Sequence, residues 1–238
     1  MFDYSKRVKS LMKEEYEKVW KKLLEMADEK AYRFLDIGCS NGKLTIKFAR
    51  RIDAKEIYGI DIDKYNLKKA KRRGVRAIYA DANGKLPFPS NFFDLILCNQ
   101  VAEHLLNPDN LFKEIHRILK TNGVAYISVP NLCSFHNRVF VLFGWQPTTI
   151  PPSTKFVFGN PLRNQRVKFE GGKHINAFSP AALIEMLEFY GLKVEKYVGS
   201  GFYPFSGKIA DVLSNIFPKL SVYQIVKVRK ITKQKIKN

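Results

Sequence analysis

Cysteine is scarce in this chain of 238 residues, and the three that occur, Cys39, Cys98 and Cys133, show no spacing typical of a metal site. An odd number of widely separated cysteines excludes a disulfide framework and is typical of proteins in a reducing compartment. We therefore expect a cytoplasmic protein without a metal site, in which these cysteines are small buried residues.

Long apolar runs are also missing. The longest stretch, near residues 139–145, is far shorter than the roughly 20 residues that a membrane-spanning helix requires. Charged residues between Lys6 and Glu17 leave no apolar core for a signal peptide. With 45% hydrophobic and 26% charged residues, the composition is that of a soluble globular protein. We predict a single domain, residues 1–238, that neither crosses a membrane nor is exported.

Acidic residues are few, because 22 Asp and Glu stand against 41 Lys and Arg and give a net charge of +19. Such an excess is typical of proteins that bind nucleic acid or an anionic membrane surface, and equally of a Lys-rich surface adapted to heat. The positive residues are spread along the chain, with one cluster at Lys227, Arg229, Lys230, Lys233, Lys235 and Lys237. We interpret them as a solvated surface with a frayed basic tail over residues 230–238, and peripheral membrane contact stays open.

Apolar patterns of strand and helix type alternate from residue 31 to residue 130. The expected strands are 33–37, 56–60, 76–79, 93–98 and 124–129, and the helices between them are 43–51, 64–73 and 107–119, followed by a cap and turn at 121–123. Parallel strands need crossover connections, so this alternation predicts an α/β fold with a doubly wound, mostly parallel sheet. A helix at 180–190, a strand at 192–198, a helix at 208–217 and a strand at 222–228 would close it.

Two segments lie outside this alternation. Residues 1–30 show helical apolar spacing and predict one or two amphipathic helices that cover the mouth of a site. Residues 131–178 are irregular, aromatic and basic, and a long aromatic segment of this kind in a compact domain is usually functional. We interpret this second segment as a substrate-side cap, and residues 179–229 as the closing helix and strands.

The turn at residues 38–42 predicts a ligand site, because its glycines allow the backbone to turn tightly and approach a ligand at a helix N-terminus. Asp61, about 20 residues beyond the glycines at a strand end, is placed to accept both hydroxyls of a ribose. A dinucleotide would require G-x-G-x-x-G, whereas Ser40 and Lys43 occupy the third and sixth positions. The pattern therefore favours a nucleoside without a diphosphate, and Asp36 suits the ammonium group of an amino acid moiety.

Several motifs together resemble those of class I S-adenosylmethionine-dependent methyltransferases, in the small-molecule branch similar to types 11 and 23. They occur in the family's order at residues 34–42, 59–63, 79–82, 92–105 and 111–130. The resemblance implies the Rossmann-like seven-stranded fold of that family, with S-adenosylmethionine as cofactor and S-adenosylhomocysteine as product. After residue 131 the match is loose.

The resemblance also implies a role for each matched residue. Gly38, Ser40 and Gly42, with Cys39 in the same turn, would line the methionine moiety; Asp36 would orient it, Asp61 would hold the ribose, Ile62 would pack on the adenine, Asp81 and Ala82 would contact the adenine edge, and Asn99 and Gln100 would border the sulfonium. An alternative is that Asp61 and Asp81 cap the helices that follow, since Asp is a preferred N-cap residue.

Methyl transfer is an in-line displacement, so much of the catalysis can come from alignment of the acceptor without a nucleophilic side chain. A base is needed only for a hydroxyl or protonated amine acceptor, and histidine usually supplies it. His174 and His104 are the candidate catalytic residues, with His136 as a further histidine to consider. The alternative for each is a structural role, and for Glu103-His104 this means positioning the loop after the fourth strand.

The sequence thus favours a methyltransferase that acts on a small molecule or on a lipid or sugar intermediate. One alternative is an RNA methyltransferase that uses the basic surface, although Asn99-Gln100-Val101-Ala102 stands where base-amine methylases carry Asn-Pro-Pro-aromatic. A second alternative is a non-catalytic binding protein that has kept the cofactor pocket, because fold does not fix function. The oligomeric state is not readable from the sequence.

Overall fold

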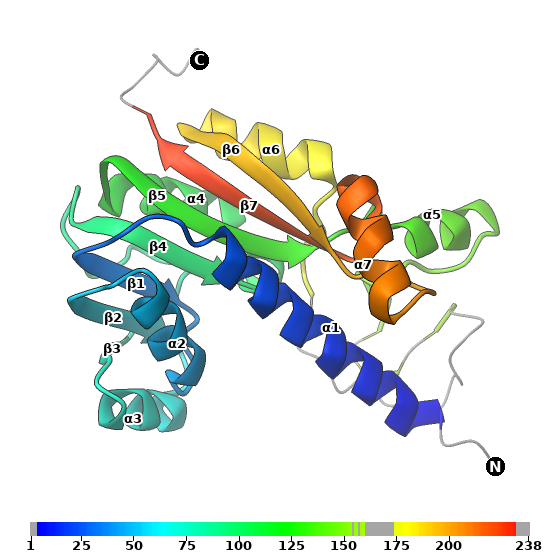
Figure 1. Ribbon diagram of the computed structural model, residues 1–238, viewed down its shortest axis with the longest axis horizontal. Coiled ribbons are helices and arrows are strands. Elements are labelled where there is room, and N and C mark those ends of the chain that lie inside the picture. Colours follow the sequence, from blue (N-terminus) through cyan, green and yellow to red (C-terminus); the bar gives the residue numbers. More distant parts are fainter. Residues whose placement is uncertain (1–3, 154, 157, 160–173, 232–238) are drawn as a thin grey trace.

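The computed structural model describes residues 4–153, 155–156, 158–159 and 174–231, with side chains from residue 14 onward. Its centre is a seven-stranded sheet in the order β3-β2-β1-β4-β5-β7-β6 (Figure 1). The strands are β1 (Arg33–Ile37), β2 (Glu56–Asp61), β3 (Arg76–Tyr79), β4 (Phe93–Asn99), β5 (Leu119–Pro130), β6 (Leu192–Ser200) and β7 (Tyr223–Lys230). All neighbours pair in parallel except β7, which is antiparallel to both β5 and β6. The predicted α/β fold with a mostly parallel sheet is confirmed.

Helices cover both faces of the sheet. They are α1 (Tyr4–Met26), α2 (Lys43–Arg51), α3 (Lys64–Arg72), α4 (Pro108–Ile118), α5 (Phe135–Leu142), α6 (Pro180–Phe189) and α7 (Gly207–Ile216), with short 3-10 helices η1 (Ala102–His104) and η2 (Pro218–Leu220). The N-terminal segment forms one continuous helix, α1, which runs across the front of the sheet in Figure 1.

The core divides along the strand alternation, because successive strand side chains point to opposite faces. On β1, Phe34 packs with α1 and α2, whereas Leu35 packs with α4 and α6 on the other face. On β4, Leu95 and Leu97 join the first cluster, and Ile96 joins the second. Both faces are therefore apolar, which explains why the central strands show continuous apolar runs.

The predicted cap and turn at residues 121–123 is wrong, because these residues belong to a strand. Helix α4 ends at Ile118 and β5 begins at once, so these residues lie inside the strand. The pairing with β4 jumps from Phe93 opposite Leu119 to Leu95 opposite Val124, and Asn122 has a left-handed φ of 64°. The Asn-Gly signal marks a bulge within β5 rather than a loop between elements.

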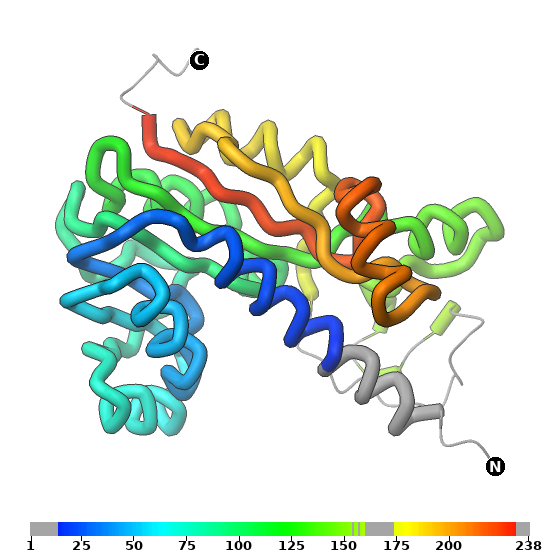
Figure 2. The backbone as a smooth tube through the Cα atoms, viewed as in Figure 1, coloured from blue at the N-terminus to red at the C-terminus, as the bar shows by residue number. Residues whose placement is uncertain are grey.

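The predicted cap at residues 131–178 is more regular than expected where it is described, because it contains α5. Residues 160–173, which the sequence assigned to this cap, lie outside the described residues. Helix α5 meets the segment before α7 at one end of the sheet, as the backbone path shows (Figure 2), and Phe135 stacks on Phe202 there at 5.7 Å between ring centroids. An aromatic contact therefore joins the cap to the segment before α7.

Part of the basic cluster near the C-terminus lies in the sheet and is paired with acids, which corrects its interpretation as a solvated surface. Lys227 is 7% exposed and forms ion pairs with Asp28 at 2.7 Å and Glu29 at 2.9 Å. Arg229 pairs with Glu29 at 2.6 Å and Glu195 at 2.5 Å. These cations are neutralised inside the protein, while residues 232–238 lie outside the described residues.

The cysteines and the helices also bear on the expectations from composition. Cys39 and Cys98 are buried as expected, whereas Cys133 is partly exposed. None of the helices in the described ranges combines the length and the apolar character needed to cross a membrane.

Candidate functional site

The turn between β1 and α2 requires glycine at two positions. Gly38 has φ of 79°, and a Cβ there would lie 2.6 Å from Cγ2 of Val101. Gly42 has φ of 77°, and a Cβ there would lie 2.9 Å from the backbone of Ala70. Both the left-handed backbone and the close approach exclude a side chain. The amides of Gly38 and Cys39 both donate to the carbonyl of Ile60, at 2.9 Å and 3.0 Å, which ties the turn to β2.

Asp36 lies at the end of β1 beneath this turn and is 4% exposed. The hydroxyl of Thr45, on α2, donates to its carboxylate at 2.6 Å. Burial, and to a smaller extent the nearby Asp61 carboxylate, raise the pKa of Asp36 to about 7. The described residues place no lysine or arginine within ion-pair distance of it. Asp36 is therefore a buried acid whose charged form lacks a counter-charge, which suits a cationic group of a ligand.

Asp61 and Asp81 do not cap helices, so that alternative is wrong for both. The carboxylate of Asp61 accepts from the amides of Ser40 and Asp63, each at 2.8 Å, and it is Asp63 that caps α3. Asp81 accepts from the amide and the side chain of Asn83, each at 2.9 Å, in a local turn before β4. Asp61 thus connects the glycine turn to the end of β2.

The remaining predicted cofactor residues lie at neighbouring strand ends. Ile62 follows β2 with its apolar side chain 64% exposed, whereas Ala82 is buried. Asn99 ends β4, accepts from the hydroxyl of Ser128 and donates to the Tyr16 hydroxyl at 3.4 Å. Gln100 has a left-handed φ of 56° and donates from its backbone to the Ser128 carbonyl at 2.9 Å. The carboxyl ends of β1, β2 and β4 therefore present these groups at one edge of the sheet.

A cavity of about 1130 Å³ opens between α1, α2 and the glycine turn. It brings together Asp36, Gly38, Cys39, Ser40 and Asn99, but Asp61, Ile62, Asp81, Ala82 and Gln100 are not part of its lining. Tyr16 and Trp20 of α1 also line it, as expected for a helix that covers the mouth of a site. Sequence reasoning assigned no role to Tyr16 or Thr45, since neither stands in a motif.

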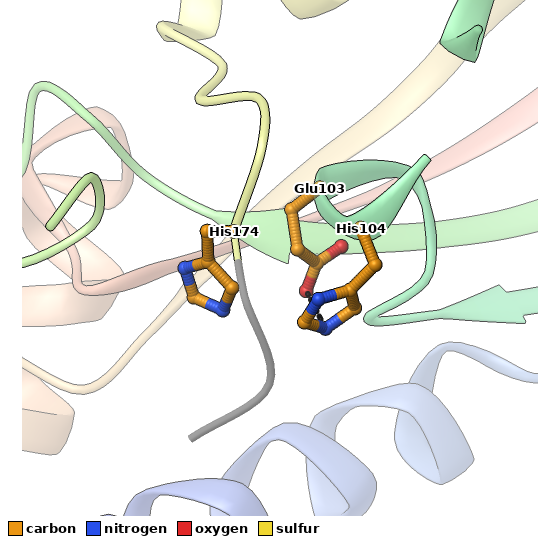
Figure 3. Close-up of side chains that lie close together, drawn as sticks. All are labelled: Glu103, His104 and His174. Carbon is orange, nitrogen blue, oxygen red and sulfur yellow. Dashed lines mark ion pairs between the residues drawn. The ribbon is translucent and has the colours of Figure 1, made fainter. Parts of the chain in front are cut away.

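The two candidate catalytic histidines lie together, although one follows β4 and the other precedes α6 (Figure 3). The rings of His104 and His174 are 5.0 Å apart between centroids in an edge-to-face arrangement. Burial lowers the pKa of His174. His136 packs elsewhere, against Tyr203 at 5.2 Å, with Nε2 3.0 Å from the Thr148 hydroxyl. Glu103 joins the first two and is 1% exposed.

Comparisons with known proteins agree with this geometry. The family model described as a methyltransferase domain matches residues 35–127. An uncharacterized protein of Methanocaldococcus jannaschii is 30% identical over 161 residues, which cover 68% of this chain and 64% of that protein. The ubiquinone biosynthesis O-methyltransferase of Pelagibacter ubique is 30% identical over 138 residues, covering 54% of this chain and 56% of that protein.

A solved structure shows the same fold. The S-adenosylmethionine-dependent methyltransferase of Mesorhizobium loti aligns with a TM-score of 0.60 at 18% identity, covering 89% of this chain and 95% of that one. The chain spans less than two thirds of the length of each of the two sequence relatives. The ordered motifs, the sheet topology and the matched domain lead to one conclusion: the chain belongs to the class I S-adenosylmethionine-dependent methyltransferases.

Proposed function

We propose that this protein transfers the methyl group of S-adenosylmethionine to a small molecule or to a lipid or sugar intermediate. The observation that carries the proposal is the buried Asp36 carboxylate beneath a turn in which Gly38 and Gly42 leave no room for a side chain. A cationic amino acid moiety would supply the counter-charge that this carboxylate lacks. The residues present therefore fit the cofactor.

Each end of the cofactor has residues suited to it. Asp36 and the turn from Gly38 to Gly42 would hold the methionine moiety, with Asn99 and Gln100 beside the sulfonium. Asp61 keeps lone pairs beyond its two amide contacts and would accept the ribose hydroxyls. An adenine ring would cover the exposed Ile62, with Asp81 and Ala82 at its edge.

When bound, S-adenosylmethionine supplies a methyl carbon attached to a cationic sulfur. The protein's part is to align the acceptor and exclude water, and a nucleophilic side chain is not needed. Tyr16 and Trp20 of α1 form part of the cavity lining. His174 or His104 would take the proton of a hydroxyl or protonated amine acceptor.

The chemical class of the acceptor has support from the surface of the cap. Large apolar side chains on α5, the residues after it and α7 are exposed: Val141, Leu142, Phe143, Trp145, Ile209, Val212, Ile216 and Phe217. We call this set the apolar end. An exposed apolar patch of this kind favours contact with a lipid or lipid-like acceptor. A relative named for ubiquinone biosynthesis is consistent with such a choice.

RNA methylation is the weaker alternative. The basic cluster that would contact phosphates includes Lys227 and Arg229, and both are paired with acids. A non-catalytic protein that has kept only the fold is weaker too, because a buried acid such as Asp36 is costly without a ligand to use it. We place the activity in a single domain over residues 1–238, in the reducing cytoplasm that the scarce cysteines favour.

The first test of this proposal is calorimetric titration of the purified protein with S-adenosylhomocysteine. We expect one site per chain; a protein that binds neither this product nor S-adenosylmethionine would refute the proposal. The second test incubates the protein with methyl-labelled cofactor and a fractionated cell extract. Label should enter small solutes or lipids, whereas label in RNA alone would favour the alternative.

A further inference from the structure

The side chains of Glu103, His104 and His174 form a compact group outside the cofactor turn (Figure 3). One ligand-type atom from each lies within 4.8 Å of the other two. Glu103 and His104 belong to η1, directly after β4, while His174 arrives from the segment before α6. We propose that these three side chains bind a divalent transition-metal ion such as Zn²⁺.

The backbone holds the two segments together independently of any ion. The amides of Ile175 and Asn176 both donate to the carbonyl of Glu103, at 2.7 Å and 3.0 Å. The side chain of Asn176 also donates to the carbonyl of Leu105. His174 is therefore fixed opposite η1 by main-chain contacts, which gives the group the preorganisation that a ligand site needs.

Glu103 points to a missing cation. It is 1% exposed, and within the described residues neither of its carboxylate oxygens has a hydrogen-bond partner. The His104 ring lies beside it, with Nε2 3.8 Å from Oε1 of Glu103. An isolated buried carboxylate is costly unless it is paired or coordinates a metal, and a divalent ion would relieve that cost.

His174 has the tautomer of a metal ligand. Its Nδ1 lies 2.9 Å from the carbonyl of Thr149, and since a carbonyl only accepts, Nδ1 carries the proton and Nε2 keeps its lone pair. Metal-binding histidines almost always donate their other ring N–H to such a partner, which fixes the ring.

The ligand set indicates the class of ion. Two imidazoles and a carboxylate suit zinc and its first-row neighbours, whereas calcium and magnesium prefer oxygen ligands. Three protein ligands leave coordination positions open, as in catalytic zinc sites. The group also adjoins the cofactor turn, because Val101, two residues before Glu103, is the side chain that would meet a Cβ at Gly38.

An open coordination position on the ion could bind the methyl acceptor. This step rests on the proposed methyltransferase function. A hydroxyl bound to the ion releases its proton to solvent more readily. The resulting oxygen anion attacks the methyl carbon as the carbon–sulfur bond breaks, which leaves a methyl ether and a neutral thioether. The site therefore favours acceptors with a hydroxyl group.

Metal binding is tested on the full chain without an affinity tag, after treatment with a chelator. Titration with Zn²⁺ should give one site with a dissociation constant on the order of micromolar or below. Co²⁺ should give a visible absorption band that Zn²⁺ abolishes. Glu103→Gln and His174→Gln should each weaken binding roughly tenfold or more. His116→Gln, outside the group on α4, should bind as the wild type does.

The outcomes separate the two proposals. Glu103→Gln keeps the size of the side chain and removes a buried charge, so the metal-free variant should unfold at or above the wild-type temperature. Wild type that binds no Zn²⁺, or variants that bind it unchanged, would overturn the metal site. Zn²⁺ binding in a protein that does not bind S-adenosylhomocysteine would leave the metal site standing and refute the methyltransferase.

Discussion

The hydroxyl of Thr45 donates a 2.6 Å hydrogen bond to the carboxylate of Asp36, between the first turns of α2 and the end of β1. This contact favours the charged form of Asp36, but burial dominates and raises its pKa to about 7. The unfolded chain ionises the carboxyl near its ordinary pKa of 3.8. The stability linked to this group is therefore complete below that pH and is lost as pH rises through about 7.

Replacing the acid tests this balance. Asp36→Asn still accepts the Thr45 hydrogen bond and has no charge to bury, so at pH 8 the free energy of unfolding should rise by up to about 4 kcal/mol, at about 1.4 kcal/mol for each unit between a pKa of 3.8 and a pKa of about 7. At pH 4 the change should be small. Denaturant unfolding at both pH values measures it. S-adenosylhomocysteine binding should weaken at pH 7.5, and a variant that is less stable at pH 8 would contradict the argument.

Asp61 and Asp63 offer a matched pair of acids two residues apart. Asp61→Ala removes the proposed ribose acceptor and the partner of the Ser40 amide, so calorimetry should show binding of S-adenosylhomocysteine weakened about tenfold or more, roughly 1.4 kcal/mol. Asp63→Ala removes the N-cap of α3 and should cost about 1 kcal/mol of stability with binding little changed. Equal loss of binding in both variants would argue against a ribose contact.

Two glycines separate steric clash from backbone strain. Gly38 has a left-handed backbone, and the Cβ that Gly38→Ala adds would lie 2.6 Å from Val101. Gly74 also has a positive φ, 91°, but a Cβ there would have no atom within 4 Å. Gly74→Ala should cost about 1–2 kcal/mol from the backbone alone. Gly38→Ala should cost more in thermal unfolding and should also weaken cofactor binding. Adding Val101→Ala should restore part of that loss; no restoration would mean that the clash is relieved another way.

The sequence predicted the cofactor turn because each of its constraints is local. Asp36, Gly38 and Gly42 belong to one strand and the turn after it, and Asp61 follows one helix later. Their spacing along the chain is therefore enough to predict that they lie together. The alternation of apolar runs likewise predicted the sheet, because parallel strands need crossover helices. The bulge at Asn122 was beyond this reasoning, since an Asn-Gly pair marks a left-handed backbone in a loop and in a strand alike.

The group of Glu103, His104 and His174 shows the other limit. The sequence suggested both histidines as candidate catalytic residues but did not indicate that they meet one buried carboxylate, because the contact depends on how the segment before α6 returns to η1. The C-terminal cations illustrate the same limit. The sequence indicated solvated side chains for Lys227 and Arg229, because it does not show that the pairing of β7 with β5 brings them to Asp28, Glu29 and Glu195.

The apolar end predicts an interaction with lipid surfaces. Leu142 is 81% exposed and Phe143 62% exposed on α5 and at its end, and Arg138 and Lys208 stand exposed nearby on α5 and α7. The acid on α7, Asp211, lies 3.7 Å from Lys18. Exposed apolar side chains among cations are typical of proteins that bind at the surface of an anionic bilayer.

Vesicle flotation checks this expectation. The protein should float with phosphatidylglycerol vesicles at low salt and less with phosphatidylcholine vesicles, because the net charge of +19 attracts anionic headgroups. Leu142→Ser with Phe143→Ser should reduce flotation severalfold, since each apolar side chain contributes on the order of 1.5–3 kcal/mol when buried. Ile62→Ser, equally exposed at the cofactor edge, is the control and should float as the wild type does. Flotation that depends on salt but is unchanged by the serine substitutions would contradict this expectation. Attraction between charges alone would then account for binding to the vesicles, and the apolar end would have another role.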